Sequence, residues 1–156
     1  MKKRFYALLI GLGIYVTAFA SVQSAQAALG ESADSITSDR LSLSAVQGVT
    51  TTLNGYTIHT IESDATKVRE YISPNGVVFG IAWNGLIHPD LTPLLGSYAG
   101  EYQEALRQTP RKPGRRRLQV KTDHIVVEKW GHMRNLQGRA YAPALIPPGV
   151  SIDEIK

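Results

Sequence analysis

The chain has 156 residues, with 17 basic and 13 acidic side chains, a net charge of +4 at pH 7 and no cysteine. The absence of cysteine excludes disulfide bonds, thiol catalysis and zinc–thiolate centres, so hydrophobic burial has to hold the fold together. The length suits one domain with a core of its own.

The N-terminus has the three parts of a secretory signal peptide. A cationic head, Met1 to Arg4, precedes an apolar run from Phe5 to Val16, and small and polar residues follow up to Ala27. The apolar run is shorter than the roughly 20 residues that a membrane-spanning helix needs. We therefore expect cleavage after Ala27, no membrane span afterwards and export to the periplasm, with extracellular release as the alternative.

Removal of residues 1–27 also changes the charge of the protein. Lys2, Lys3 and Arg4 lie in this segment, so the exported chain would be close to neutral. A nearly neutral exported domain has no general attraction to polyanions, and we therefore expect no nucleic acid as a partner.

Residues 28–54 are rich in Ser and Thr and poor in large apolar side chains. They predict an N-terminal arm, with a short helix over about residues 34–45 as the alternative. A folded domain over residues 55–156 is expected to follow.

Three strands are predicted in the first part of this domain, at residues 56–62, 67–72 and 77–83, because β-branched and aromatic residues dominate there. Ser73-Pro74-Asn75-Gly76, between the second and third strands, has the composition of a tight turn. Consecutive strands with such a turn predict an antiparallel meander. The third strand is almost wholly apolar and should be the most buried.

Helical signals come next. Asp90 could cap a short helical turn, and Ser97 could cap a longer helix that ends before Pro110. The spacing of Tyr98 and Tyr102 would place both rings on one face of that helix.

A second β region is predicted over residues 118–121, 124–129 and 132–141, with a turn at Trp130-Gly131 and an irregularity at Gly138. A capping-box pattern from Ser151 then opens a final short helix. The order of the elements predicts one small α+β domain. Its sheet would be mainly antiparallel, a meander plus a C-terminal hairpin, with one central helix and short flanking helices.

Several motifs of the chain carry a family resemblance. They are Ala28-Leu29-Gly30, Arg69-Glu70-Tyr71, Pro74 to Phe79, Trp83-Asn84-Gly85, Pro89-Asp90-Leu91, Leu94-Leu95-Gly96 with Tyr98, and Gly138 to Leu145 with Pro148-Gly149-Val150. Together they resemble a family of small exported proteins of Gram-negative bacteria, catalogued as domain of unknown function twenty-eight forty-four. The resemblance covers nearly all of the chain after residue 27 and implies one exported domain. It brings no activity, cofactor or catalytic residue.

The histidines are the natural candidates for metal binding or general-base catalysis. His124 and Glu128 lie on a predicted strand, where four residues span about 13 Å, too far for one metal ion. His59 and His132 are expected to face solvent. His88 lies in a predicted loop and is the strongest functional candidate, although a structural role is favoured. No nucleophile elbow, phosphate loop or dinucleotide fingerprint occurs after residue 27, so we predict no catalytic residue, metal site or cofactor.

Two sets of residues are candidates for binding. Aromatic and polar side chains could line a groove, and two arginines near Tyr141 could form an anion-recognising corner; this set is Trp83, His88, Asp90, Arg134, Arg139 and Tyr141. The second set is a cationic tract made by Arg111, Lys112, Arg115, Arg116 and Arg117. It could contact anionic lipid headgroups, lipopolysaccharide or an acidic partner, with a solvated loop as the alternative.

Three functions stay open. A non-enzymatic secreted or periplasmic binding or interaction module of the cell envelope is favoured, because the sequence shows no catalytic constellation. Its partner would be an envelope protein or an anionic envelope surface. The alternatives are a hydrolase-type periplasmic enzyme with a site near His88 and Asp90, and an accessory factor for assembly of an envelope protein. A pocket that gathers His88, Asp90 and another polar group would favour the enzyme.

Overall fold

The computed structural model describes residues 28–32, 47–53, 55–110 and 113–156. The predicted signal peptide with its cleavage site at Ala27, the alternative helix over residues 34–45, and Arg111 and Lys112 lie outside the described residues.

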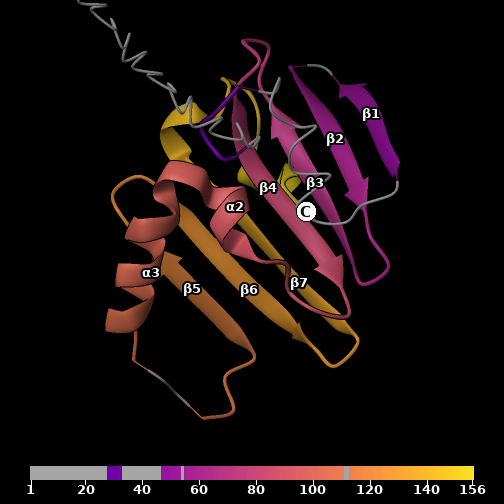
Figure 1. The fold of residues 1–156 in the computed structure, drawn as a ribbon. Helices are drawn as coiled ribbons and strands as arrows, with labels where there is room; N and C mark the ends of the chain where they lie inside the picture. The colour runs from indigo at the N-terminus through magenta and orange to yellow at the C-terminus, as the bar shows by residue number, and fades with distance from the viewer. Residues whose placement is uncertain (1–27, 33–46, 54, 111–112) are drawn as a thin grey trace, which may run out of the picture.

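A seven-stranded sheet forms the centre of the molecule, and each of its neighbouring pairs is antiparallel (Figure 1). Its order is β1-β2-β3-β4-β7-β6-β5. The strands are β1 (Gln47–Leu53), β2 (Tyr56–Glu62), β3 (Thr66–Ile72), β4 (Val78–Gly85), β5 (Arg117–Lys121), β6 (Val126–His132) and β7 (Asn135–Tyr141). The predicted α+β class with one mainly antiparallel sheet is confirmed.

The sheet consists of two meanders, β1 to β4 and β5 to β7, joined by pairing between β4 and β7. The sequence analysis did not predict β1, which lies in the segment assigned to the N-terminal arm. The second region is a three-stranded meander, where the sequence analysis expected a hairpin. Its edge strand β5 pairs with β6 from Arg117↔Trp130 to Lys121↔Val126.

The turn between β3 and β4 is confirmed, since the amide of Gly76 donates to Ser73 O at 2.9 Å and Gly76 has a φ of 77°. The predicted turn at Trp130-Gly131 is wrong. Both residues belong to β6, and the chain reverses after His132, where Arg134 takes a φ of 67°. Gly131 has a positive φ within the strand, and a β-carbon there would overlap the backbone of Asn135. The absence of a side chain at Gly131 therefore lets β6 and β7 approach each other closely at this point.

Strand β4 is the most buried strand of its meander, as predicted, because both faces of the sheet are covered at this position. The pairing of β3 with β4 shifts register between Tyr71 and Ile72, which pair with Gly80 and Val78, so that Phe79 on β4 is skipped. As a result Phe79 and the space above Gly80 both belong to the face that the C-terminal segment covers, whereas Ile81 and Trp83 belong to the other face.

Helices cover one face of the sheet (Figure 1). They are α2 (Leu91–Leu95), the 3₁₀ turn η2 (Gly96–Tyr98) and α3 (Ala99–Gln108), and they follow one another without a break. Asp90 caps α2 as predicted, accepting from the amide of Thr92 at 2.9 Å. Ser97 does not cap α3, because η2 runs directly into it and leaves Tyr98 at the cap position. No helix among the described residues is both long and apolar enough to cross a membrane.

The C-terminal segment covers the opposite face. It contains the 3₁₀ turns η3 (Pro143–Leu145) and η4 (Ile152–Glu154), and the predicted capping box of Ser151 with Glu154 is present in η4. Ile155 is fully buried above Gly80 in a cluster with the rings of Tyr56, Tyr71 and Phe79. The hydroxyl of Tyr71 donates to Lys156 O at 2.9 Å, which fixes the end of the segment on the sheet.

Gly138 is not the site of an irregularity, because the β4–β7 and β6–β7 ladders pass through it in register. Its neighbour across the β4–β7 pair is Trp83, and a β-carbon at Gly138 would overlap the indole ring and the backbone oxygen of Glu128. The missing side chain therefore creates the space that the indole fills.

Gly138→Ala should lower the free energy of unfolding by about 1–3 kcal/mol, the usual cost of overpacking a closed core. Gly100→Ala is the matched control, because Gly100 lies in α3 with nothing near its β-carbon position. The control should leave stability unchanged or raise it by up to about 1 kcal/mol. Urea unfolding followed by tryptophan fluorescence measures both, and equal stability of the two variants would contradict the close Trp83–Gly138 packing.

Candidate functional site

An open groove of about 530 Å³ lies at one end of the helix-covered face. The β4–α2 loop, the start of β5 and the β6–β7 hairpin surround it. Among the described residues, its lining contains four cationic residues and no Asp or Glu. The lining residues are His88, Arg115, Arg116, Arg117, Leu118, Lys129, Trp130, Gly131, His132, Met133 and Leu136. We call this feature the cationic groove.

Lys129 lies where the groove meets a smaller pocket. The strand register places Trp83, Gly138, Lys129 and Leu118 in one row across β4, β7, β6 and β5. The ammonium group of Lys129 lies 5.6 Å from the centre of the Tyr102 ring. No carboxylate of the described part of the chain forms an ion pair with it.

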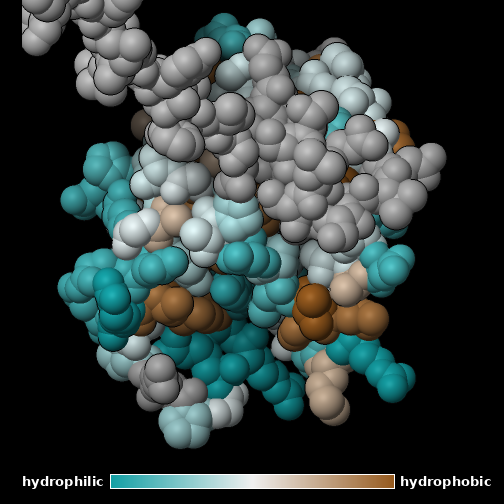
Figure 2. Space-filling model, viewed as in Figure 1, coloured by the Kyte–Doolittle hydropathy of each residue, from teal (hydrophilic) through white to brown (hydrophobic). Residues whose placement is uncertain are grey.

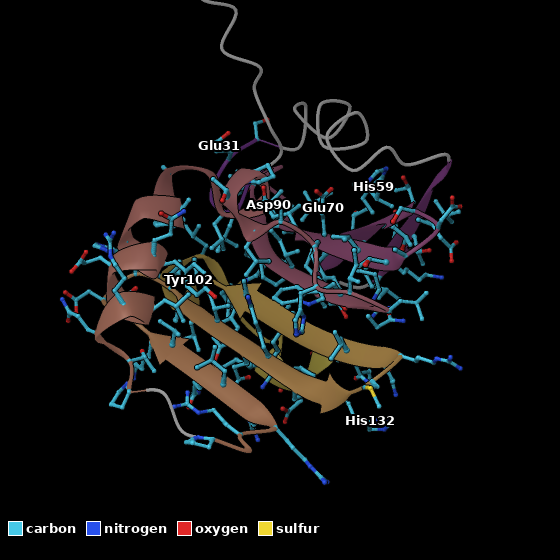
Figure 3. The ribbon with its side chains drawn as sticks, turned by 60° about the horizontal axis from the view of Figure 1, so that its bottom comes forward. Glu31, His59, Glu70, Asp90, Tyr102 and His132 are labelled. Carbon is cyan, nitrogen blue, oxygen red and sulfur yellow. The ribbon has the colours of Figure 1, made fainter. Side chains whose placement is uncertain are left out.

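The smaller pocket, of about 230 Å³, lies between α2, α3 and Lys129. Tyr102 lines it and is only 5 % exposed, and within the described residues its buried hydroxyl has no hydrogen-bond partner. Figure 3 shows Tyr102 beneath α3, directed toward the sheet. The Tyr102 ring therefore forms part of the wall of this pocket beside Lys129, with its hydroxyl buried.

His88 is held by a hydrogen bond from the buried Trp83. The indole Nε1 donates to Nδ1 of His88 at 2.9 Å, which requires the neutral imidazole to carry its proton on Nε2. Burial, together with the nearby charge of Lys129, holds the pKa of His88 below its ordinary value of 6.5. His88 can thus donate from Nε2 to a bound acceptor, but it has no free lone pair with which to take a proton.

Asp90 does not line the cationic groove. Its carboxylate caps α2 and borders the smaller pocket. The structure therefore places His88 and Asp90 in different pockets. Among the described residues no group of three or more His, Asp or Glu side chains could hold a metal ion.

Arg139 and Tyr141 lie on the opposite face, where Arg139 contacts buried Glu128. The guanidinium Nε of Arg139 donates to Glu128 at 2.6 Å, and its Nη1 donates to Ile152 O at 2.9 Å. Arg139 also lies 5.7 Å from the centre of the Tyr141 ring. Arg134 is in the β6–β7 turn and is not part of this group. Arg139 thus ties the C-terminal segment to the sheet.

Glu128 is 3 % exposed and takes part in three polar contacts. It accepts from Arg139, Arg117 and the side-chain amide of Gln119. Burial raises the pKa of this carboxyl, but the hydrogen bonds and charges of Arg139 and Arg117 outweigh burial and hold the pKa below its usual range. Glu128 therefore stays ionised and structural.

The cationic tract is divided by these contacts. Arg117 belongs to the Glu128 group, and Arg115 donates to the carbonyl of Pro110. Arg115 and Arg116 are exposed on the rim of the cationic groove. Sequence reasoning missed Lys129 as the residue that completes the groove. The available signal was the alternation of Val127 and Lys129 on one face of a strand, which places a charge on the helix-covered side.

The expectation that His59 faces solvent is wrong. Its side chain is 12 % exposed, and Nδ1 lies 3.4 Å from the carboxylate of Glu70, which is fully buried. The two residues are direct neighbours on β2 and β3, and both are labelled in Figure 3. Gly48 on β1 leaves room for the imidazole. His132 is exposed, as expected, and lies at the far end of the sheet (Figure 3).

The His88 geometry predicts a specific titration. The pKa of His88 is lower in the folded chain than in the unfolded chain, so the unfolded chain takes up this proton at a higher pH. The neutral imidazole therefore contributes its full stabilisation of the fold above pH 6.5. This stability is lost as the pH falls toward the folded-state pKa. Long-range ¹H–¹⁵N NMR should show the Nε2–H tautomer and a pKa below 6.5, with exposed His132 as reference in the same spectra. An Nδ1–H tautomer would contradict the bond from Trp83.

No curated protein and no solved structure matches the chain. A family model described as protein of unknown function (DUF2844) matches residues 25–155, which include both pockets and both covers of the sheet. This is the family that the sequence motifs resemble. The chain therefore belongs to the DUF2844 family of proteins of unknown function.

Proposed function

We propose that this protein is an exported, non-enzymatic binding module of the cell envelope that receives an anionic group in the cationic groove. One observation carries the proposal. Arg115, Arg116 and Lys129 line the same groove as His88, whose Nε2 carries the proton, and no Asp or Glu of the described residues lines it.

The chemistry of the lining favours an acceptor-rich ligand. Each of these four side chains donates hydrogen bonds, and the guanidinium groups of Arg115 and Arg116 suit the paired oxygens of a carboxylate or phosphate. Leu118, Leu136 and the other apolar walls reduce the access of water and strengthen such contacts. An acidic segment of an envelope protein and an anionic lipid surface both present this chemistry.

The geometry gives less support to the hydrolase alternative. To act as a general base, His88 would need a free lone pair on its imidazole ring, but Nδ1 already accepts the hydrogen bond from Trp83. Asp90, its suggested partner, caps α2 and borders a different pocket. Turnover of any substrate that depends on His88 would favour the enzyme instead. A role in assembly of an envelope protein is compatible with the same groove.

The proposal of export rests on the composition of residues 1–27. Ala28 and Leu29 are fully buried, and the amide of Leu29 donates to Leu94 O at 2.9 Å. Cleavage after Ala27 would keep both of these buried residues in the mature protein. We place the mature protein in the periplasm, with release from the cell as the alternative.

Expression of the full chain in a Gram-negative host should yield a periplasmic protein whose N-terminal residue is Ala28, as read by intact-mass spectrometry. Ala27→Leu should block processing, because signal peptidase needs a small side chain before the cut. Gln26→Leu is the matched control, since the position between the two small residues tolerates a large one. An unprocessed cytoplasmic product from the unaltered chain would contradict export.

Titration of the folded domain with inorganic phosphate tests the groove. Backbone NMR shifts should concentrate at Gly131 and residues 115–118, and Lys129→Gln should weaken binding about three- to tenfold, as expected for a partly solvated charge-assisted contact. Lys67→Gln is the control, because Lys67 lies on β3 and pairs with Glu62. Equal effects of the two substitutions, or shifts centred elsewhere, would count against the groove as an anion site.

A further inference from the structure

Exposed apolar side chains gather beside the cationic groove. Leu86 is 54 % exposed, Ile87 57 % and Met133 90 %, and they are three of the six large apolar residues that are exposed in the described part of the chain. Leu86 and Ile87 follow β4, and Met133 lies in the β6–β7 turn.

The strand register brings these two loops together. Gly85, the last residue of β4, is the partner of Leu136 on β7, and the β6–β7 turn lies just before Leu136. His88 and Met133 both line the cationic groove. Figure 2 shows brown and tan surface flanking a teal hollow in the lower half of this face. We call Leu86, Ile87 and Met133 the apolar tips.

Cations surround the apolar tips. Arg134 follows Met133 in the same turn and takes a φ of 67°, while Arg115 and Arg116 lie across the groove. In the part of the chain that the structure describes, no acidic residue lines the groove, and loop residues 86–88 contain none. One end of the molecule therefore combines exposed apolar loops with positive charge, a pairing that suits the boundary between anionic headgroups and acyl chains.

Building on the function proposed above, we propose that this end of the molecule docks on an anionic bilayer surface. The apolar tips enter the headgroup boundary, and Arg115, Arg116, Arg134 and Lys129 contact the anionic groups. A soluble anion would engage the groove and leave the apolar tips in water. A bilayer engages both features, and two such signals together give more stable attachment than either one alone.

Sedimentation with phosphatidylcholine vesicles, with and without phosphatidylglycerol, measures this docking on the folded domain. The protein should bind the anionic vesicles and not the neutral ones, and added salt should weaken the binding. The double variant Leu86→Ser/Ile87→Ser should bind anionic vesicles about tenfold more weakly. The matched control is Val49→Ser/Leu53→Ser, which removes exposed apolar side chains from the distant edge strand β1 and should change binding less than about twofold.

A second variant reports insertion of the β6–β7 turn into the bilayer through a gain of fluorescence signal, not through a loss of binding. Met133→Trp should show a blue-shifted emission on anionic vesicles and protection from a water-soluble quencher. Trp83 and Trp130, the tryptophans of the unaltered chain, provide the baseline spectrum. Urea unfolding of each variant verifies that the fold is retained.

The outcomes separate the two proposals. Unchanged vesicle binding by Leu86→Ser/Ile87→Ser would overturn insertion and leave the cationic groove in place. Phosphate binding in the groove with no vesicle binding would overturn the bilayer as the partner and favour an acidic protein segment. Absence of both phosphate and vesicle binding would overturn the proposed function as well.

Discussion

The packing of Trp83 over Gly138 is the contact on which the rest of the structure depends. It lies at the pairing of β4 with β7, the one place where the two meanders meet in the sheet. The same indole donates to His88 and so fixes the ring of a residue that lines the cationic groove. In the cross-strand row, Gly138 also separates Trp83 from Lys129. The missing side chain at Gly138 thus makes room for the indole, and the indole in turn holds His88 beside the groove.

Strand alternation gives two neighbouring charges opposite roles. Glu128 and Lys129 are consecutive in β6, so their side chains project to opposite faces. Glu128 points under the C-terminal segment, where Arg139 and Arg117 compensate its burial. Lys129 points to the helix-covered face, where it meets Tyr102 and no carboxylate of the described residues. On β6, therefore, the ion pairs of Glu128 lie on one face of the sheet and the ammonium group of Lys129 lies on the other.

Local chemistry predicted the features that depend on near neighbours in the chain. The Ser73–Gly76 turn, the Asp90 cap and the burial of β4 follow from short stretches of sequence. Contacts between distant segments could not be derived in this way. The polar, Thr-rich β1 is a strand because β2 supplies its hydrogen bonds, and His59 is shielded because Glu70 lies opposite it. For the same reason the groove was only half predicted: its arginines form a visible cluster in the sequence, whereas Lys129 joins them through the register of three strands.

The C-terminal cover has a consequence for the partly open states of the protein. Residues 143–156 contain only short 3₁₀ turns, and they are held by Ile155 over Gly80 and by bonds from Tyr71 and Arg139. Such a segment can detach as a cooperative unit while the strand ladder persists, since none of its residues belongs to the ladder. Detachment would expose the rings of Tyr56, Tyr71 and Phe79 on the sheet, an apolar surface that favours self-association of an otherwise folded molecule. We therefore expect substitutions that loosen this segment, more than those elsewhere on the surface, to promote aggregation of the folded protein.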